Sequence, residues 1–392
     1  MQTRLEPACL VIADISGYTG YLAGVELDHA QDILADLIGT VVGALRPSFR
    51  LAKLEGDAAF AYVLAETVDG AHLQDTLERC YFAFRRRLRD IRQSSTCECN
   101  ACMLIPNLNL KILAHHGVVA RHRIAGREEL VGSDVVVVHR LLKNRVEEDL
   151  GLAAYAMYTD ACIRAMGADP AVLGLREHRE DFEGVGEVVG WVRDLEAAWR
   201  DEEARTETIV RPEESAAELA FVLPGPAEVV WEWITSPARR IQWQAAGGVT
   251  DVRETTVSGR RGVGTTNHCM HGRDAIVEEI LDWRPFEHFT VRFQMPVPGV
   301  PKMVMSELLE PVTGGTRVTL RIRRPRTAKD RAAIEPLRPM FEASMRAGIE
   351  PLGELVAADV AARSAAAADA EEPPVPASAG RNMREPLAAE AR

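Results

Sequence analysis

The sequence of 392 residues has no apolar run near the roughly 18 to 20 residues that a membrane-spanning helix needs. Cysteine is scarce, with seven in the whole chain, which argues against a disulfide scaffold. Positive charge is also low, because 46 Lys and Arg face 58 Asp and Glu, giving a net charge of -12. We therefore expect no membrane span and no nucleic-acid partner, although a local basic groove can still hold a nucleotide.

The first 17 residues, MQTRLEPACLVIADISG, contain one arginine and a short apolar run that is broken by Asp14. They lack the long apolar core and small-residue cleavage site of a signal peptide. We therefore expect a cytoplasmic protein. With 47% hydrophobic and 27% charged residues, the composition is typical of a globular protein with two or three domains.

Hydrophobic periodicity predicts a mixed α+β architecture, an α/β sandwich around a mainly antiparallel sheet, in the N-terminal half. The segments expected as strands are 7–13, a hairpin at 47–63, 108–120, 129–137 and a closing pair at 177–195; helices are expected at 22–45 and 67–93. The predicted domains are residues 5–200 and 213–360, joined by a charged linker at 201–212. A long helix is expected near 329–360. Residues 361–392 are rich in Ala, Glu and Pro, which predicts a disordered tail.

Two carboxylates stand in tight turns next to strand-like runs. Asp14 lies in residues 13–20 (ADISGYTG), and Asp57 lies in residues 53–60 (KLEGDAAF). The backbone N–H groups of such a turn, at the start of a helix, can face phosphates. Either aspartate alone could equally cap a turn or a helix.

Together, in this order and spacing, the two segments resemble the paired signatures of class III adenylate and guanylate cyclases. The resemblance implies a ferredoxin-like class III cyclase fold that converts a nucleoside triphosphate to a cyclic nucleotide with two divalent ions. Hard oxygen ligands suit Mg²⁺ or Mn²⁺. Such ions would activate the 3′-hydroxyl and offset the charge that develops on pyrophosphate. The residues implied are the metal ligands Asp14, Asp57 and the Ile15 carbonyl, the phosphate-facing Ser16, Gly17, Tyr18 and Thr19, and the base-recognising Lys53.

Residues 131–141 (VGSDVVVVHRL) resemble the stretch of these cyclases that carries a transition-state arginine. The resemblance assigns that role to Arg140, although a solvated helix arginine is as compatible with the sequence. Val136 stands where an asparagine is expected, and valine donates no hydrogen bond. Glu129 falls at a base-selecting position and, with Lys53, would favour guanine. Three interpretations stay open: a slow cyclase, an unusual base choice, or nucleotide binding without turnover. The resemblance also implies a homodimer, because the family's sites form between two subunits.

Three cysteines, Cys97, Cys99 and Cys102, lie within six residues. They could hold Zn²⁺ with a fourth ligand from His115 or His116, or they could be reduced thiols without metal. Together with Asp-Ile-Ser-Gly and Gly-Asp-Ala-Ala, the Cys-x-Cys-Asn-x-Cys pattern resembles DUF2652, a cyclase-like family of bacterial domains of unknown function.

Residues 213–360 contain a Pro-Gly-Pro turn at 224–226, a helix with Trp231, the sequence DWRPF at 282–286 and a long final helix. This order resembles the SRPBCC superfamily, the helix-grip fold of START and polyketide-cyclase-like proteins. The resemblance implies an apolar cavity for a lipid or other hydrophobic small molecule. The side chains that could line it, or simply pack the core, are Trp231, Trp233, Phe293, Met295, Met303, Met305 and Met345. His268 and His271 lie on opposite faces of an expected strand, so we expect no metal there.

The leading hypothesis is a nucleotide cyclase-like signalling protein that is regulated by a hydrophobic ligand in its second domain. The alternative is a non-catalytic nucleotide- or lipid-binding protein with a degenerate cyclase fold. A third hypothesis makes the second domain an enzyme acting on its hydrophobic ligand, but its sequence has no clustered acid–base pair to support one.

Overall fold

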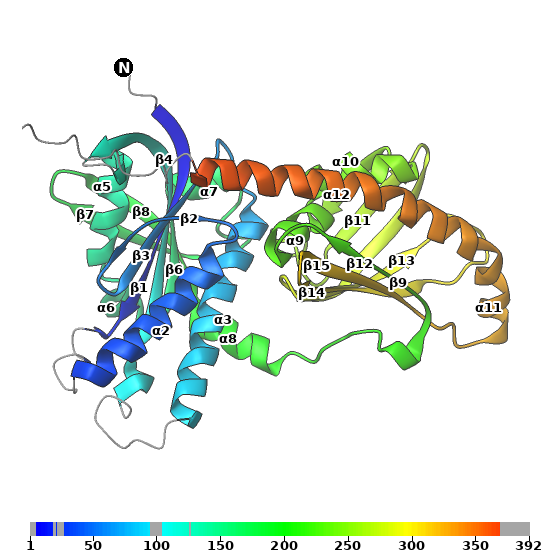
Figure 1. Cartoon of the computed structure of the whole chain (residues 1–392), viewed down its shortest axis with the longest axis horizontal. Helices are drawn as coiled ribbons and strands as arrows, with labels where there is room; N and C mark the ends of the chain where they lie inside the picture. Colours follow the sequence, from blue (N-terminus) through cyan, green and yellow to red (C-terminus); the bar gives the residue numbers. More distant parts are fainter. Residues whose placement is uncertain (1–4, 19–20, 22–26, 95–103, 125–126, 369–392) are drawn as a thin grey trace, which may run out of the picture.

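The structure is a computed structural model that describes residues 5–18, 21, 27–94, 104–124 and 127–368. These residues form two sheets, each with its own helices, and a long C-terminal helix that runs along the second sheet and reaches the first domain (Figure 1). The α+β fold class predicted from the sequence is confirmed. None of the helices in these ranges is both long and apolar enough to cross a bilayer.

The first sheet has eight strands among the described residues, in the order β2-β3-β1-β4-β6-β8-β7, with β5 paired to β4. Only β4 and β6 pair in parallel. Its inner strand β1, between β3 and β4, is buried on both faces, which explains its continuous apolar run. The strands are β1 (Leu5–Ser16), β2 (Arg50–Glu55), β3 (Ala58–Leu64), β4 (Asn109–Ile124), β5 (Arg127–Val131), β6 (Tyr155–Thr159), β7 (Arg176–Phe182) and β8 (Gly186–Asp194).

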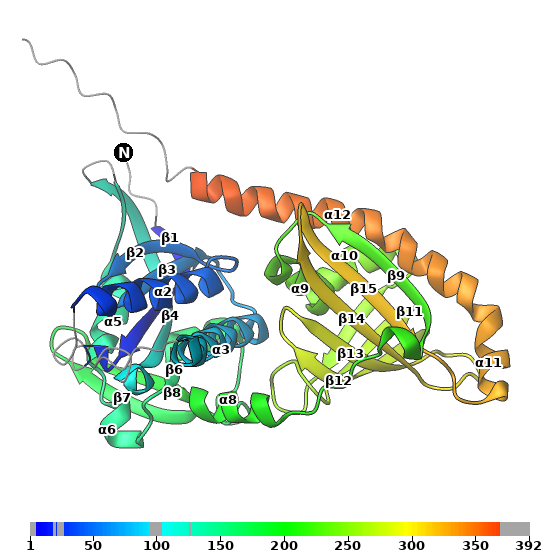
Figure 2. The same cartoon turned by 60° about the horizontal axis from the view of Figure 1, so that its bottom comes forward.

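Helices cover both faces of the first sheet. Apolar side chains of α2 and α3, such as Leu37 and Leu77, share a core with one face, while Val138 of α5 packs on the other face with Phe60. The first domain is therefore a sandwich with its sheet in the middle layer (Figure 2). The helices are α2 (Leu27–Leu45), α3 (Gly70–Ser94), α5 (Ser133–Arg140), α6 (Val146–Leu150), α7 (Asp160–Met166) and α8 (Leu195–Ala204).

The second sheet is antiparallel throughout, in the order β10-β11-β12-β13-β14-β15-β9. Leu352 and Val356 of α12 pack into its core together with Trp231 of α9. The long helix thus closes one face of the sheet, as the helix-grip resemblance implied (Figures 1 and 2). The strands are β9 (Ser215–Leu223), β10 (Asp251–Thr255), β11 (Thr266–His271), β12 (Asp274–Arg284), β13 (His288–Gln294), β14 (Met303–Val312) and β15 (Gly315–Arg323). The helices are α9 (Ala227–Thr235), α10 (Pro237–Gln244), α11 (Ala328–Ile334) and α12 (Arg338–Ala368).

Two predicted boundaries are wrong. The strand expected at 129–137 ends at Val131, where Gly132 (φ 148°) turns the chain and α5 begins. The valine run has strand propensity, but α5 is fixed by tertiary contacts of Asp134 and His139. The disorder expected from residue 361 does not begin there, because alanine-rich residues 361–368 continue α12. Residues 369–392 lie outside the described residues.

Candidate functional site

The β1 and β3 strands bring Asp14 and Asp57 together. Asp14 is near the end of β1 and pairs across the sheet with Ala58, the residue after Asp57. The Ile15 N–H donates to the Asp57 carbonyl over 3.1 Å, which ties the β2–β3 turn to β1. Gly56 enables that turn with a φ of 69°. Burial and the nearby Asp14 carboxylate raise the pKa of Asp57. Two hard oxygen donors that repel one another suit a divalent cation such as Mg²⁺ or Mn²⁺.

A lysine that the sequence analysis missed lies at this pair. Lys111 of β4 is opposite Asp14 in the strand register, and its Nζ lies 3.0 Å from Asp14 Oδ2. The same ammonium group donates to the Leu142 carbonyl over 3.2 Å. A fixed positive charge therefore already compensates part of the acidic pair. Within the described ranges, no group of three or more His, Cys, Asp or Glu side chains gathers to hold a metal, so further ligands would have to include backbone oxygen or water.

The turn after β1 is shaped by Gly17. Its φ of 84° favours glycine, and a Cβ there would stand 2.8 Å from the Asn107 carbonyl oxygen. Burial and the Asp57 carboxylate raise the pKa of Tyr18, so this side chain is electrostatically coupled to the acidic pair. Ser16 Oγ donates to the Ala153 carbonyl over 3.3 Å. Thr19 lies outside the described residues.

The residues that the sequence predicted to contact the nucleotide, Lys53, Glu129 and Arg140, do not lie against the two aspartates. Lys53 Nζ lies 2.7 Å from Glu55 Oε1, and His139 Nε2 of α5 lies 3.1 Å from the other oxygen of the same carboxylate. Arg140 is exposed at the end of α5, and Glu129 is half-buried on β5. In the described part of the chain, no hydrogen bond or ion pair joins Lys53, Glu129 or Arg140 to the two aspartates.

Helix α5 is fastened to the sheet through a buried histidine. His115 contacts Thr159 Oγ1 through Nδ1 over 2.8 Å and Asp134 Oδ1 through Nε2 over 3.1 Å. The Val118 N–H donates to the other Asp134 oxygen over 2.7 Å. Burial lowers the pKa of His115. His116 contacts the Ala65 carbonyl.

Both histidines considered as a fourth zinc ligand are thus already hydrogen-bonded. Cys97, Cys99 and Cys102 lie outside the described residues, so the zinc hypothesis stays a prediction.

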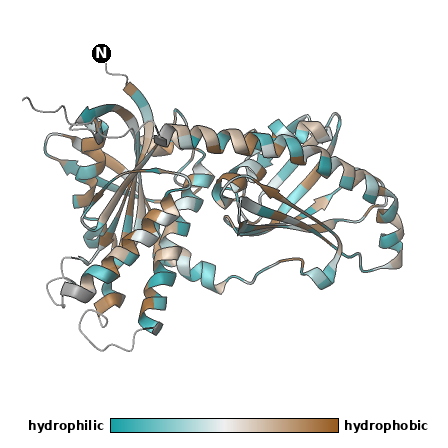
Figure 3. Cartoon of the chain, viewed as in Figure 1, coloured by the Kyte–Doolittle hydropathy of each residue, from teal (hydrophilic) through white to brown (hydrophobic). Residues whose placement is uncertain are grey.

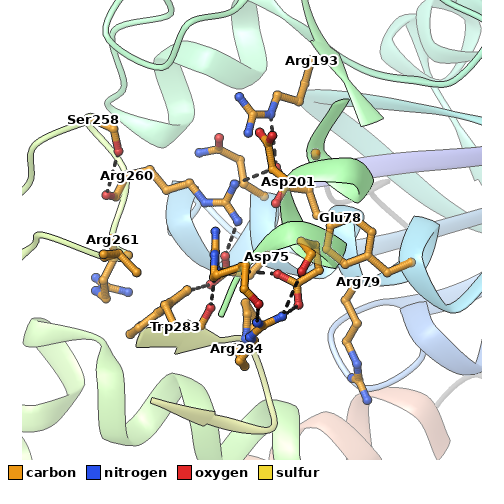
Figure 4. Close-up of a pocket in the computed structure, with 18 of the residues that line it drawn as sticks. Asp75, Glu78, Arg79, Arg193, Asp201, Ser258, Arg260, Arg261, Trp283 and Arg284 are labelled. Carbon is orange, nitrogen blue, oxygen red and sulfur yellow. Dashed lines mark hydrogen bonds and ion pairs between the residues drawn. The ribbon is translucent and has the colours of Figure 1, made fainter. Parts of the chain in front are cut away.

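A polar cavity of about 280 Å³ lies between the two domains (Figure 4). Arg260, in the loop between β10 and β11, reaches α3 and pairs with Glu78 over 2.7 Å and with Asp75. Trp283 Nε1 donates to Asp75 over 3.3 Å. Burial alone would raise the pKa of Glu78, but Arg260 and Arg193 together outweigh burial and lower that pKa. The domains are thus joined by a buried ionic contact that no local sequence pattern indicated.

Apolar cavities lie on the inner face of the second sheet, beside α12. One of about 320 Å³ is lined by Phe293, Met295, Met305 and Met345 among others. A second of about 270 Å³ also has Phe293 and Met295 in its wall, together with Met303. These five residues therefore line cavities, which is one of the two roles that the sequence left open for them.

Trp231 and Trp233 line neither cavity and pack in the core, which is the other role that the sequence left open. Trp231 instead packs in an aromatic cluster with Trp283, at a ring distance of 4.6 Å. Trp233 is held by a hydrogen bond from its Nε1 to Asp359 over 2.9 Å.

Charged groups are buried near the larger cavity. Arg240 of α10 forms two hydrogen bonds to Glu278, of 2.9 and 3.1 Å. Glu307 of β14 lies near this pair, and its burial raises its pKa to about 8. Cys269 and His271 share the face of β11 that borders the cavity, and His268 is on the other face, as expected from the strand period.

Comparisons with known proteins match both halves of the chain. The model of the DUF2652 family, a protein family of unknown function, matches residues 34–150. The model of the polyketide cyclase/dehydrase and lipid transport family matches residues 216–357. The chain thus combines a DUF2652 domain with a domain of the SRPBCC superfamily, and both resemblances seen in the sequence are confirmed.

The chain is also 35% identical over 155 residues to the uncharacterized protein Rv2561/Rv2562 of Mycobacterium tuberculosis. The match covers 39% of this chain and 69% of the mycobacterial protein. The chain belongs to the same family as that protein.

Among solved structures, the adenylyl cyclase CyaB from P. aeruginosa matches with a TM-score of 0.37 and 13% identity, over 50% of this chain and 97% of that one. Protein MLL2253 from Mesorhizobium loti matches with a TM-score of 0.28 and 15% identity, over 36% of this chain and 95% of that one. These values are too low to assign a function.

Proposed function

We propose that the N-terminal domain binds a nucleoside triphosphate with divalent metal and converts it to a cyclic nucleotide. The observation that supports this most is the convergence of Asp14 and Asp57, where burial and the Asp14 carboxylate raise the pKa of Asp57. Asp14, Asp57 and the Ile15 carbonyl would hold Mg²⁺ or Mn²⁺. When bound, such an ion supplies charge neutralisation at the phosphates and lowers the pKa of the attacking hydroxyl.

The chain's own groups have distinct roles in this proposal. Backbone N–H groups of residues 16–18 would orient the triphosphate. Lys53 and Glu129 would contact the base, and Arg140 would stabilise the charge that develops on the transferred phosphoryl group. Because no hydrogen bond or ion pair among the described residues joins these three side chains to Asp14 or Asp57, we propose that they act on the site of a second copy in a homodimer.

Exposed apolar side chains support such a dimer. Leu54, Val118 and Val136 are 53%, 44% and 50% exposed. They lie around α5, which contacts β2 through His139 and Glu55, and β4 through Asp134. An apolar patch around α5 would be buried when two copies meet.

The decisive experiment incubates the full chain with Mn²⁺ and ATP, GTP, CTP or UTP in turn, and measures cyclic nucleotide by chromatography. We expect a product from at least one nucleotide, and its loss in Asp57→Ala but not in the control Asp149→Ala, an exposed aspartate of α6. No product from any nucleotide, or a product independent of Asp57, would contradict catalysis.

A second candidate is a nucleotide-binding domain without turnover. It is favoured by Val136, which cannot orient a ribose, and by Lys111, which already neutralises part of the acidic pair. Mn²⁺-dependent binding of nucleotide that requires Asp57 and yields no cyclic product would establish this alternative.

We further propose that the C-terminal domain holds a hydrophobic small molecule or lipid that regulates the first domain. The ionic contact of Arg260 with α3 supports this coupling, because α3 packs under the sheet that carries Asp14. An Arg260→Met variant should retain nucleotide binding but lose any response of the first domain to the ligand.

A further inference from the structure

The smaller apolar cavity opens at the end of the C-terminal domain around α11, away from the first domain (Figure 1). Its volume is about 270 Å³. Figure 3 shows hydrophilic colouring at α11, where the chain carries Lys, Asp and Arg. The lining combines apolar side chains inside with six charged ones: Arg323, Arg324, Arg331, Glu335, Arg338 and Glu342.

Behind these charged groups the walls are apolar and adjoin the larger cavity. Phe293, Met295 and Phe341 belong to the walls of both cavities, which are therefore adjacent. The rings of Phe293 and Phe341 stack at 5.7 Å between β13 and α12. An apolar chain entering past the arginines would thus stay in contact with hydrocarbon along the inner face of the sheet.

Within the described part of the chain, most of the arginines at the mouth have no carboxylate close enough to neutralise their charge. Arg324 donates to the Ser215 carbonyl over 3.1 Å, and Arg331 donates to two backbone carbonyls over 3.4 Å. Across the described ranges, neither has a carboxylate within 4.0 Å. Arg323 lies 3.8 Å from Glu214, and its Nε is buried without a hydrogen-bond partner. Only Arg338 has a close carboxylate, Glu342, at 2.9 Å.

Among the residues that the structure describes, the opposite end of the apolar space offers no free positive charge. Glu278 borders the larger cavity and is paired with Arg240, while Glu307 lies nearby in the same interior. A buried anion placed there would face two carboxyl groups and one arginine that is already engaged. An anionic group therefore fits at the mouth and not at the inner end.

We propose that this cavity binds an anionic amphiphile, with its apolar chain inside and a carboxylate or phosphate head held by Arg323, Arg324 and Arg331. Guanidinium groups bind such heads through paired, charge-assisted hydrogen bonds. The proposal rests on the proposed function of the C-terminal domain as a hydrophobic-ligand module, and it adds the class and the orientation of the ligand.

The test titrates the full chain with dodecanoate, dodecyl phosphate, 1-dodecanol, dodecyltrimethylammonium and inorganic phosphate, each below its aggregation limit. Calorimetry measures affinity, and fluorescence of Trp243, which lines the larger cavity, reports entry of the chain. We expect at least one of the two anionic amphiphiles to bind about tenfold or more tightly than the alcohol. Which of the two does so distinguishes a carboxylate from a phosphate head. Inorganic phosphate alone should bind much more weakly.

The matched variants are Arg324→Gln/Arg331→Gln and the control Arg326→Gln, an exposed arginine of the same loop that does not line the cavity. The double variant should lose the preference for the anion yet bind dodecanol as before, which shows that the cavity is intact. The control should behave as the unchanged protein. If dodecanol binding is lost in the double variant, the single variants Arg324→Gln and Arg331→Gln are compared in the same way.

Three outcomes would overturn the proposal. Equal affinity for dodecanol and the anions removes the head-group site but leaves a hydrophobic-ligand domain. An anion preference that persists in the double variant assigns the head to other residues. Failure of every apolar probe to bind contradicts the ligand-binding role of the C-terminal domain itself, while the nucleotide proposal is judged separately by the cyclic-nucleotide assay.

Discussion

Lys111 Nζ lies 3.0 Å from Asp14 Oδ2, so the acidic pair at the end of β1 is already in contact with a positive charge of the chain. Two unit charges at about 4 Å interact by roughly 4 kcal/mol at the effective dielectric near a protein surface. The ammonium group and a divalent cation would therefore compete for the same carboxylate. The affinity of the site for metal depends on this competition.

Replacing Lys111 with methionine should strengthen metal binding. We expect Lys111→Met to lower the melting temperature without metal, because Asp14 loses its counter-charge, and to bind Mn²⁺ about tenfold more tightly, or about 1.4 kcal/mol. Calorimetric titration with Mn²⁺ measures this, with Lys143→Met, an exposed lysine after α5, as control. Weaker Mn²⁺ binding by Lys111→Met would show that the lysine assists the metal site.

Replacing Asp57 with asparagine should remove the repulsion from Asp14. The pKa of Asp57 is raised, so its ionisation destabilises the fold as pH rises through that pKa. We expect Asp57→Asn without metal to melt about 2–4 °C higher than the unchanged protein at pH 7, with the difference vanishing near pH 3. Mn²⁺ should raise the melting temperature of the unchanged protein only. An equal Mn²⁺ effect on both proteins would place the metal elsewhere.

Removing Arg260 should leave the buried Asp75 without its ion-pair partner, and Glu78 with Arg193 alone. Arg260→Met should lower the free energy of unfolding by about 3–5 kcal/mol, the usual cost of breaking a buried ion pair. Urea unfolding, followed by tryptophan fluorescence, measures the loss. Arg253→Met is the control, since Arg253 is 71% exposed on β10. A loss no larger than that of the control would mean that the domains do not depend on this contact.

Glu307 should make stability depend on pH. Burial raises its pKa from 4.5 to about 8, so the stabilisation of its protonated form is complete below pH 4.5 and is lost as pH rises to about 8. Glu307→Gln should remove this loss and flatten the unfolding free energy between pH 5 and 8. The control Glu310→Gln changes a carboxylate of the same strand that is 59% exposed. An unchanged pH profile in Glu307→Gln would show that Glu307 is ionised in the fold at neutral pH.

Short sequence patterns predicted those parts of the site that are built from neighbouring residues. The hairpin around Asp57 and the turn after Asp14 were predicted because each depends on a short apolar run and a glycine. The proximity of Asp14 and Asp57 was predicted from the family resemblance. Lining a cavity was one of the two roles predicted for Phe293 and Met305 from the resemblance of the second domain to the helix-grip fold.

Long-range partners could not be predicted in this way. Lys111 faces Asp14 only through the register of β1 with β4, and Arg260 meets Glu78 across 182 residues of sequence. Nothing near Glu307 in the sequence distinguishes it from an exposed strand glutamate. Each of these contacts depends on tertiary packing, which overrides local propensity, as it does for the valines of α5.

The helix α12 runs from the mouth of the smaller cavity to the first domain, and its rotation about its own axis decides which side chains face that domain. It begins at Arg338, beside the cavity mouth, and its last turns bring Arg363 within 3.3 Å of the Pro47 carbonyl of the first domain. Each residue of an α-helix advances the chain by about 1.5 Å and turns it by about 100°. One residue inserted after Ala361 would therefore point Arg363 away from Pro47 while both domains keep their cores. The length of this helix in whole residues thus sets whether Arg363 contacts the first domain.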